Sequence, residues 1–199
     1  DPILFIAGLG RCGTTMVMRM LDKGGIRVAG PRPSYEDDHM LRTRPIHVRQ
    51  EWVLENAGRA VKWIDPLQAR LDWNTWKGGV PTFILLRRDS EHQARSIGKL
   101  LGYKLSKSEV ASVAQSLRTD QVTTEAYLDQ AGNVYSMSFD SIIKEPEVAA
   151  AKLALICKVA LNQHLNIEAA ARAVIRRKVW CAPDLAIEDQ LMQEEEANG

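Results

Sequence analysis

A glycine-rich segment near the N-terminus has the residue types and the spacing that suit a bound phosphate. Gly8 and Gly13 bracket four residues, as in a Walker A loop, and the apolar run 3–7 precedes them. The run predicts a buried strand, and residues 16–21 predict a helix after the turn. Such a unit directs backbone N–H groups and the positive end of a helix dipole toward one point. The segment is therefore a candidate anion site.

The loop departs from the nucleoside triphosphatase pattern in the placement of its cation. Those enzymes use a lysine after the second glycine on the β- and γ-phosphates, and the next hydroxyl on magnesium. Here Thr14 replaces that lysine, Thr15 keeps the hydroxyl position, and Arg11 supplies a cation from within the loop. The pattern predicts a phosphate-bearing donor other than ATP. A strand–turn–helix packing junction without a ligand is the alternative.

A second candidate anion site follows another apolar run. Residues 81–86 are typical of a central parallel strand. Arg87 and Arg88 follow its end, and Ser96 lies eight residues after Arg88. An arginine at a strand end and a hydroxyl on the next helix can converge on one dianion, which a guanidinium binds with two hydrogen bonds. A surface ion pair is the alternative interpretation of Arg88.

Together these two segments resemble the sulfotransferases. The stretch Arg11–Thr15 is similar to their (Lys/Arg)-Ser-Gly-Thr-(Thr/Ser) loop, and Arg88 with Ser96 matches their strand-end arginine and the serine eight residues after it. Those enzymes transfer a sulfuryl group from 3′-phosphoadenosine 5′-phosphosulfate to a hydroxyl or amine. The resemblance implies that the loop holds the 5′-phosphosulfate and that the second site holds the 3′-phosphate. Cys12 stands where serine is usual, so one hydroxyl contact is lost.

The resemblance also names the residues expected to bind the donor. A late basic segment, 176–178, lies where the family often closes over the nucleotide, with a solvated basic helix end as the alternative. The donor-binding residues that the resemblance implies are Gly10, Arg11, Cys12, Gly13, Thr14, Thr15, Arg88, Ser96 and Arg177.

Three residues are expected to take part in catalysis. By its position in the loop, Arg11 is implied to stabilise charge on the bridging oxygen. Many family members have a Lys-Thr-His-Leu-Pro segment, and this chain has Lys62 and Pro66 in place but Ile64 at the histidine position. Lys62 is therefore expected to contact the phosphosulfate, or alternatively to reach solvent from a strand end.

The proton acceptor has to come from another segment. Other branches of the family use a glutamate shortly after the second strand, and residues 34–37 resemble that segment. Glu36 is the preferred general base, and a solvated acidic loop is the alternative interpretation. Its substitutes are Asp37, Asp65 and His39.

Composition sets limits on the class of protein. The formal net charge of +1 argues against a surface that coats nucleic acid. Cys12, Cys157 and Cys181 are widely spaced and predict neither a zinc site nor a disulfide framework, so a reducing, cytoplasmic location is expected. No signal peptide or membrane span is predicted, and whether residues precede Asp1 stays open.

Strand and helix patterns alternate along the chain, which predicts one α/β domain over residues 1–187 with helices on both faces of a parallel sheet, as in a P-loop three-layer sandwich. Residues 188–199 form an acidic tail that is expected to fray. The expected strands are 3–7, 26–29, 60–64, 81–86 and 134–139. The expected helices are 16–21, 46–56, 91–101, a solvated pair over 106–131, 146–161 and 167–179.

The sequence thus predicts an in-line sulfuryl transferase that needs no metal. A P-loop kinase or phosphotransferase, which requires magnesium, and a nucleotide-binding protein without catalysis are the alternatives. The acceptor is left open among small molecules, glycans, lipids and peptides. Trp73 and Trp76 are interpreted as packing residues, with the wall of an acceptor pocket as the alternative.

Overall fold

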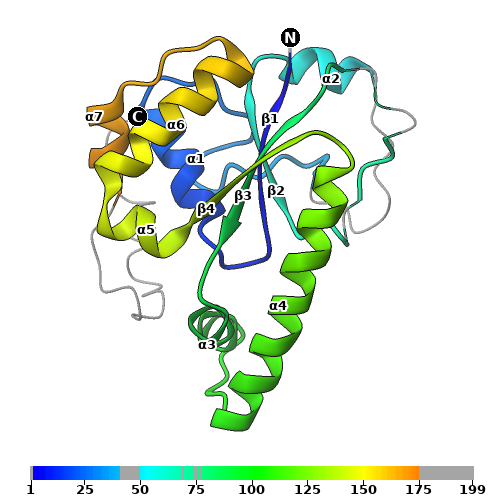
Figure 1. The fold of residues 1–199 in the computed structure, drawn as a ribbon, viewed down its shortest axis with the longest axis vertical. Helices are drawn as coiled ribbons and strands as arrows, with labels where there is room; N and C mark the ends of the chain where they lie inside the picture. The colour runs from blue at the N-terminus through cyan, green and yellow to red at the C-terminus, as the bar shows by residue number, and fades with distance from the viewer. Residues whose placement is uncertain (1, 41–49, 69, 74–75, 77, 175–199) are drawn as a thin grey trace.

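The computed structural model describes residues 2–40, 50–68, 70–73, 76 and 78–174 (Figure 1). Its centre is a sheet of four parallel strands in the order β2-β1-β3-β4. In the chain these strands are β1 (Leu4–Gly8), β2 (Ala60–Ile64), β3 (Thr82–Arg87) and β4 (Asn133–Ser138). Because β1 pairs with both β2 and β3, the segments after these three strands emerge side by side at one edge of the sheet.

Helices cover both faces of the sheet, which confirms the predicted α/β class. One face packs against α1 (Thr14–Lys23), α6 (Pro146–Leu161) and α7 (Ile167–Arg172), and the other packs against α2 (Gln50–Asn56) and the end of α4 (Lys107–Asp129). The helices α3 (Ser90–Leu100) and α4 extend beyond the carboxyl ends of the strands (Figure 1), and α5 (Phe139–Lys144) follows β4 directly.

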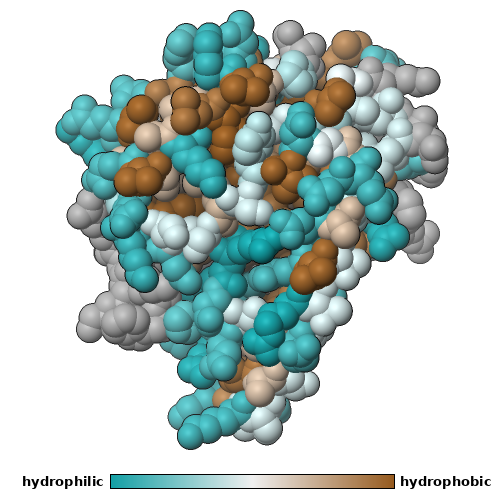
Figure 2. Space-filling model, viewed as in Figure 1, coloured by the Kyte–Doolittle hydropathy of each residue, from teal (hydrophilic) through white to brown (hydrophobic). Residues whose placement is uncertain are grey.

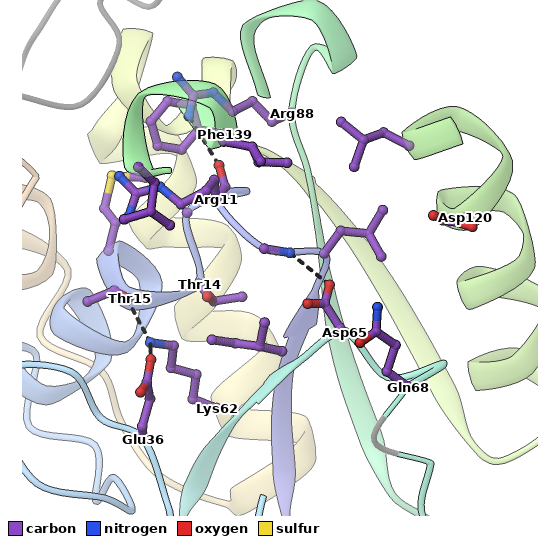
Figure 3. Close-up of a pocket in the computed structure, with 18 of the residues that line it drawn as sticks. Arg11, Thr14, Thr15, Glu36, Lys62, Asp65, Gln68, Arg88, Asp120 and Phe139 are labelled. Atoms are coloured by element: carbon purple, nitrogen blue, oxygen red, sulfur yellow. Dashed lines mark hydrogen bonds and ion pairs between the residues drawn. The ribbon is translucent and has the colours of Figure 1, made fainter. Parts of the chain in front are cut away.

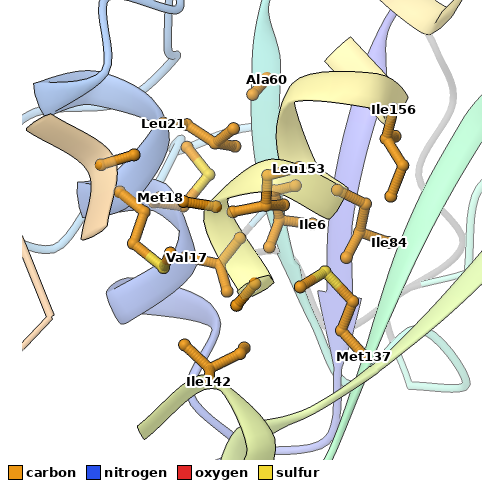
Figure 4. Close-up of a cluster of buried hydrophobic side chains, with 14 of the residues drawn as sticks. Ile6, Val17, Met18, Leu21, Ala60, Ile84, Met137, Ile142, Leu153 and Ile156 are labelled. Carbon is orange, nitrogen blue, oxygen red and sulfur yellow. The ribbon is translucent and has the colours of Figure 1, made fainter. Parts of the chain in front are cut away.

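The strands are buried on both faces, as their continuous apolar runs predict. Ile6 of β1 and Ile84 of β3 lie in a cluster with Met18 of α1 and Leu153 of α6 (Figure 4). The alternate residues of β1, such as Phe5, belong to a second cluster on the opposite face. The period of two along a strand therefore divides one apolar run between two cores.

The second cluster settles the place of the two tryptophans. Trp73 lies edge-on to Phe83, with ring centroids 5.9 Å apart, and Trp76 lies 5.9 Å from Phe5. Both tryptophans pack against the core on the α2 side of the sheet. The packing interpretation is confirmed.

Two element predictions are wrong. Residues 26–29 form a single bridge, Val28 to Ala60, because Gly25 and Gly30, both with positive φ, confine the extended segment to four residues. The expected helix pair over 106–131 is the one helix α4, since no glycine or proline interrupts residues 107–130. Its capping box, Ser106 with Glu109, is present as predicted.

Other boundaries shift by a few residues. The last strand ends at Ser138, where the Ser138 hydroxyl accepts a hydrogen bond from the N–H of Ser141 and starts α5, a helix that the sequence analysis missed. Of the helix expected over 46–56, residues 50–56 form α2. The later part of the final helix, Arg177 and the acidic tail lie outside the described residues.

The outer surface mixes polar and apolar side chains. Figure 2 shows apolar groups over the region of α6, where Val148, Leu155 and Val159 are exposed. Among the described helices, none has both the length and the apolar composition needed to cross a lipid bilayer.

Candidate functional site

A cavity of about 670 Å³ lies at the carboxyl ends of β1, β2 and β3 (Figure 3). This is the edge where open parallel sheets bind their ligands. The loop after β1 contributes to its wall, Arg88 does so directly after β3, and α1, β2, α3, α4 and α5 contribute further residues. The described predicted site residues that line it are Gly10, Arg11, Gly13, Thr14, Thr15, Glu36, Lys62 and Arg88.

The loop after β1 has the geometry of an anion cradle. Gly13 is the N-cap of α1 with φ of +103°, and a Cβ there would lie 2.4 Å from the ring of Phe139. Only glycine fits this position, because the left-handed backbone and the missing space both exclude a side chain. Since glycine carries no capping side chain, no N-cap side chain covers the first turn of α1, and its residues Thr14, Thr15 and Met16 line the cavity.

Two non-glycine residues in the cavity wall have strained backbones. Arg11 has φ of +66° and Asp65 has φ of +50°, both in the left-handed region. Such conformations persist where surrounding structure holds them, and they are enriched at functional sites. The Asp65 Oδ1 atom accepts a hydrogen bond of 2.9 Å from the N–H of Gly10, which ties the two strained segments together.

Arg88 and the loop after β1 meet in this cavity. Arg88 is only 6% exposed, and its Nη1 donates a hydrogen bond of 3.1 Å to the carbonyl oxygen of Arg11. Its guanidinium lies over the ring of Phe139, 4.5 Å from the ring centroid. Residues 77 positions apart in the chain thus place two cations against one opening.

Ser96 takes a different position from the one expected. Its hydroxyl is fully buried, accepts a hydrogen bond of 3.3 Å from Nε of Arg11, and does not line the cavity. In this arrangement Ser96 orients the Arg11 side chain. Direct contact between Ser96 and a phosphate stays a prediction.

Two of the expected donor-binding amides are engaged within the protein. The N–H of Gly10 donates to Asp65, and the N–H of Cys12 donates to the carbonyl oxygen of Leu9 at 3.2 Å. Burial raises the pKa of the Cys12 thiol to about 12, so the thiol is neutral and unreactive at physiological pH. Cys12 therefore serves the packing of the loop.

Lys62 is, like Arg88, a buried cation of the site. Its side chain is 3% exposed, and its three protons go to Thr15 Oγ1 at 2.9 Å, the Ser34 carbonyl oxygen at 2.8 Å and Glu36 Oε1 at 2.9 Å. Burial lowers the pKa of Lys62, while the bond to Glu36 opposes that shift. The solvent-reaching alternative for Lys62 is wrong, because the end of β2 lies under the loop that contains Glu36.

The residues named as substitutes for Glu36 differ in whether they line the cavity. Asp37 Oδ1 accepts hydrogen bonds from the N–H of His39 and from Nε1 of Trp52, and the ring of His39 stacks on Trp52. Neither Asp37 nor His39 lines the cavity, whereas Asp65 does. Burial is the main cause that raises the pKa of Asp65 above its ordinary value.

Sequence reasoning missed Arg19 and Asp120, which also line the cavity. The guanidinium of Arg19 has Nε and Nη1 buried, without a hydrogen-bond acceptor anywhere in the described part of the chain. Arg19 lies four residues after Thr15, on the same side of α1, and this spacing is a signal that a helical projection would have shown. No comparable local signal exists for Asp120, which α4 brings in from another part of the chain.

Within the described ranges, no group of three or more His, Cys, Asp or Glu side chains is placed to hold a metal ion. Comparison with known proteins finds no family model that matches this chain and no curated protein with significant sequence similarity.

Proposed function

We propose that this protein transfers a sulfuryl group from 3′-phosphoadenosine 5′-phosphosulfate to a hydroxyl or amine of an acceptor. The observation that carries the proposal is the hydrogen bond from Arg88 to the carbonyl oxygen of Arg11, which brings both candidate anion sites to one cavity. A donor with phosphates on both the 3′- and 5′-oxygens needs two such sites at a short separation. The cavity volume of about 670 Å³ is in the range of small-molecule and nucleotide sites.

Each residue near the loop has a part in this proposal. The first N–H groups of α1 and the Arg11 guanidinium hold the 5′-phosphosulfate and stabilise the charge that develops on its bridging oxygen. Arg88, already held by Phe139, binds the 3′-phosphate. Two buried nitrogens of Arg19 have no acceptor among the described residues, so an anionic ligand would supply acceptors for these donors.

The position of Lys62 favours this function over a magnesium-dependent phosphotransferase. In P-loop phosphotransferases, the hydroxyl at the position of Thr15 binds magnesium. Here that hydroxyl lies 2.9 Å from the ammonium of Lys62, which would repel a divalent cation at the same oxygen. The hydroxyl that binds the metal in a kinase is here a hydrogen-bond acceptor for a lysine that is paired with Glu36.

Glu36 is the base that the sequence suggests, and its contact with Lys62 limits that role. Protonation of Glu36 would remove the countercharge of a buried ammonium, which is energetically costly. Asp65, whose pKa burial raises, is the second candidate for the proton acceptor on the same cavity. A Glu36→Gln variant and an Asp65→Asn variant assayed side by side will assign the role, since only one should lose turnover while keeping nucleotide affinity.

The proposal includes a cytoplasmic location, which the sequence analysis expected. Cys12 and Cys157 are buried free thiols. Free thiols are stable in a reducing compartment.

Calorimetric titration tests the proposal directly. Adenosine 3′,5′-bisphosphate should bind without metal and more tightly than ATP with magnesium. Release of the bisphosphate from the sulfo-donor, measured across a panel of alcohols, phenols and amines, then separates an enzyme from a silent binding protein. Tighter binding of ATP with magnesium would overturn the proposal.

A further inference from the structure

The cavity has two halves of opposite character (Figure 3). The half around the loop and α1 carries the arginines Arg11, Arg19 and Arg88, together with the ion pair of Lys62 and Glu36. The half toward α3 and α4 has an apolar wall of Leu67, Ile97, Leu100 and Leu117, with the carboxylates of Asp65 and Asp120. We call this second region the α3–α4 half.

The two carboxylates carry negative charge that the protein leaves unneutralised. Asp65 accepts its hydrogen bond from a neutral backbone N–H, that of Gly10. In the described part of the chain, neither Asp65 nor Asp120 forms an ion pair with a lysine, arginine or histidine. Burial raises the pKa of Asp65, and the charge of Asp120 adds to that rise, which shows that Asp65 lies within electrostatic range of Asp120.

The wall beside these carboxylates would bury an apolar molecule. Leu100 is half exposed at the end of α3, while Leu117 of α4 is buried. Covering such a wall with hydrocarbon is favourable, by about 25 cal/mol for each Å² of apolar surface removed from water. A neutral apolar molecule there would also strip water from the carboxylates, and that cost has no compensation.

These observations favour one kind of occupant. We propose that the α3–α4 half binds the acceptor, and that the acceptor is an amphipathic cation: an apolar body that carries an ammonium group. The apolar body packs against the leucines and isoleucine of this half, and the ammonium faces Asp120 and Asp65. This inference rests on the proposed function in one respect, namely that the bound molecule is the sulfuryl acceptor. The expectation that an apolar ammonium compound binds here follows from the residues that line the cavity.

Three probes of equal chain length and different charge test the inference: octylamine, octan-1-ol and octanoate. Calorimetric titration into the protein saturated with adenosine 3′,5′-bisphosphate should show octylamine binding at least about tenfold more tightly than octan-1-ol, the effect of one partly desolvated charge pair. Octanoate should bind most weakly, because the carboxylates repel it. The affinity for octylamine should fall as salt is added.

The variant Asp120→Asn removes the negative charge and keeps the size of the side chain. The side chain of Asp120 makes no hydrogen bond to another described residue, so the substitution breaks none there. It should lower the affinity for octylamine about tenfold and leave that for octan-1-ol and for the bisphosphate unchanged. Asp129→Asn is the matched control, because Asp129 lies on the same helix, is exposed and does not line the cavity.

Equal affinities for octylamine and octan-1-ol, or an unchanged affinity in the Asp120→Asn variant, would overturn the inference. Displacement of octylamine by submillimolar magnesium would overturn it as well, because the carboxylates would then form a metal site. The titration with adenosine 3′,5′-bisphosphate is independent of the titrations with octylamine, octan-1-ol and octanoate. Octylamine binding without bisphosphate binding would refute the proposed function and leave the cation site standing.

Discussion

Arg88 is held in place before any ligand arrives. The ring of Phe139 supports one face of its guanidinium, and the carbonyl oxygen of Arg11 accepts one of its protons. A side chain fixed in this way loses little conformational freedom when it binds a phosphate. Its contribution to affinity should therefore be large and specific for the group that it contacts.

The variant Arg88→Ala should weaken the binding of adenosine 3′,5′-bisphosphate by roughly 10- to 100-fold, the value of one or two charge-assisted hydrogen bonds. Binding of 5′-AMP, which lacks the 3′-phosphate, should change much less. Titration calorimetry with both nucleotides measures the difference. Arg95→Ala is the control, since Arg95 is an exposed residue of α3 paired with Glu91. Equal losses for the two nucleotides would assign Arg88 to another phosphate.

The partly buried carboxylate of Asp65 should make the stability of the fold depend on pH. Its pKa is raised in the folded protein, so the folded state binds its proton more readily than the unfolded state does. Below the ordinary value of 3.8 both states are protonated and the residue costs nothing. As the pH rises through the folded pKa, the ionised group destabilises the fold.

Asp65→Asn should therefore be more stable than the natural protein at about pH 7.5, because asparagine keeps an oxygen for the N–H of Gly10 and carries no charge. The difference should shrink as the pH falls and should vanish near the ordinary pKa of an aspartate. Urea unfolding at several pH values measures it. A difference that stays constant with pH would show that the charge of Asp65 costs nothing in the fold.

Local sequence patterns predicted some residues of the candidate site and missed others. Arg88 was predictable because it directly follows an apolar strand, and such residues gather at the sheet edge. The partners of Lys62 were not predictable, because they depend on how the loop that contains Ser34 and Glu36 folds over β2. The burial of Ser96 behind Arg11 likewise depends on the angle between α3 and the sheet.

Helices and strands followed their patterns wherever the pattern was continuous. The strand at 81–86 and the helix at 146–161 lie within a residue of their predicted bounds. The segment 26–29 did not, since four residues between two glycines with positive φ cannot extend a ladder. Whether such a short segment forms a strand depends on the residues that pack beside it in the fold, and the sequence of the segment alone does not reveal these.

The long helix α4 supplies Leu117 and Asp120 to the cavity, so its stability matters for the α3–α4 half. The Ser106 hydroxyl accepts a hydrogen bond from the N–H of Glu109, and the Glu109 carboxylate accepts one from the N–H of Ser106. These bonds satisfy N–H groups that the helix start would otherwise leave unpaired.

Ser106→Ala should lower the free energy of unfolding by about 1 kcal/mol, the usual cost of losing an N-cap. Urea unfolding followed by circular dichroism measures the change. Ser116→Ala, an exposed substitution in the middle of α4, should be neutral or slightly stabilising because alanine favours helix. A Ser106 variant as stable as the Ser116 control would show that the helix needs no cap.

The whole molecule gathers its site from segments that are distant in the chain. The parallel order β2-β1-β3-β4 brings the carboxyl ends of β1, β2 and β3 to one edge of the sheet. The helix α4, which follows these strands in the chain, contributes residues to the same cavity. Nucleotide binding should therefore stabilise the entire domain, since it links elements that only the folded chain brings together.

Adenosine 3′,5′-bisphosphate at a hundred times its dissociation constant should add about 2.7 kcal/mol to the free energy of unfolding. For a chain of this length that corresponds to a rise in Tm of roughly 5–10 °C. A thermal unfolding series with increasing sodium chloride should show the rise diminish, because salt screens the attraction between the phosphates and the arginines. ATP with magnesium should give a smaller shift; an equal or larger one would favour the phosphotransferase alternative.

A substitution at Gly13 should affect more than the backbone of that residue. A methyl group at this position would press on the ring of Phe139, and that ring supports the guanidinium of Arg88. Under the proposed function, a substitution at Gly13 would thus disturb both the loop that holds the 5′-group and Arg88, which binds the 3′-group. A single changed codon at Gly13 should accordingly weaken both phosphate contacts, whereas Arg88→Ala weakens only one of them.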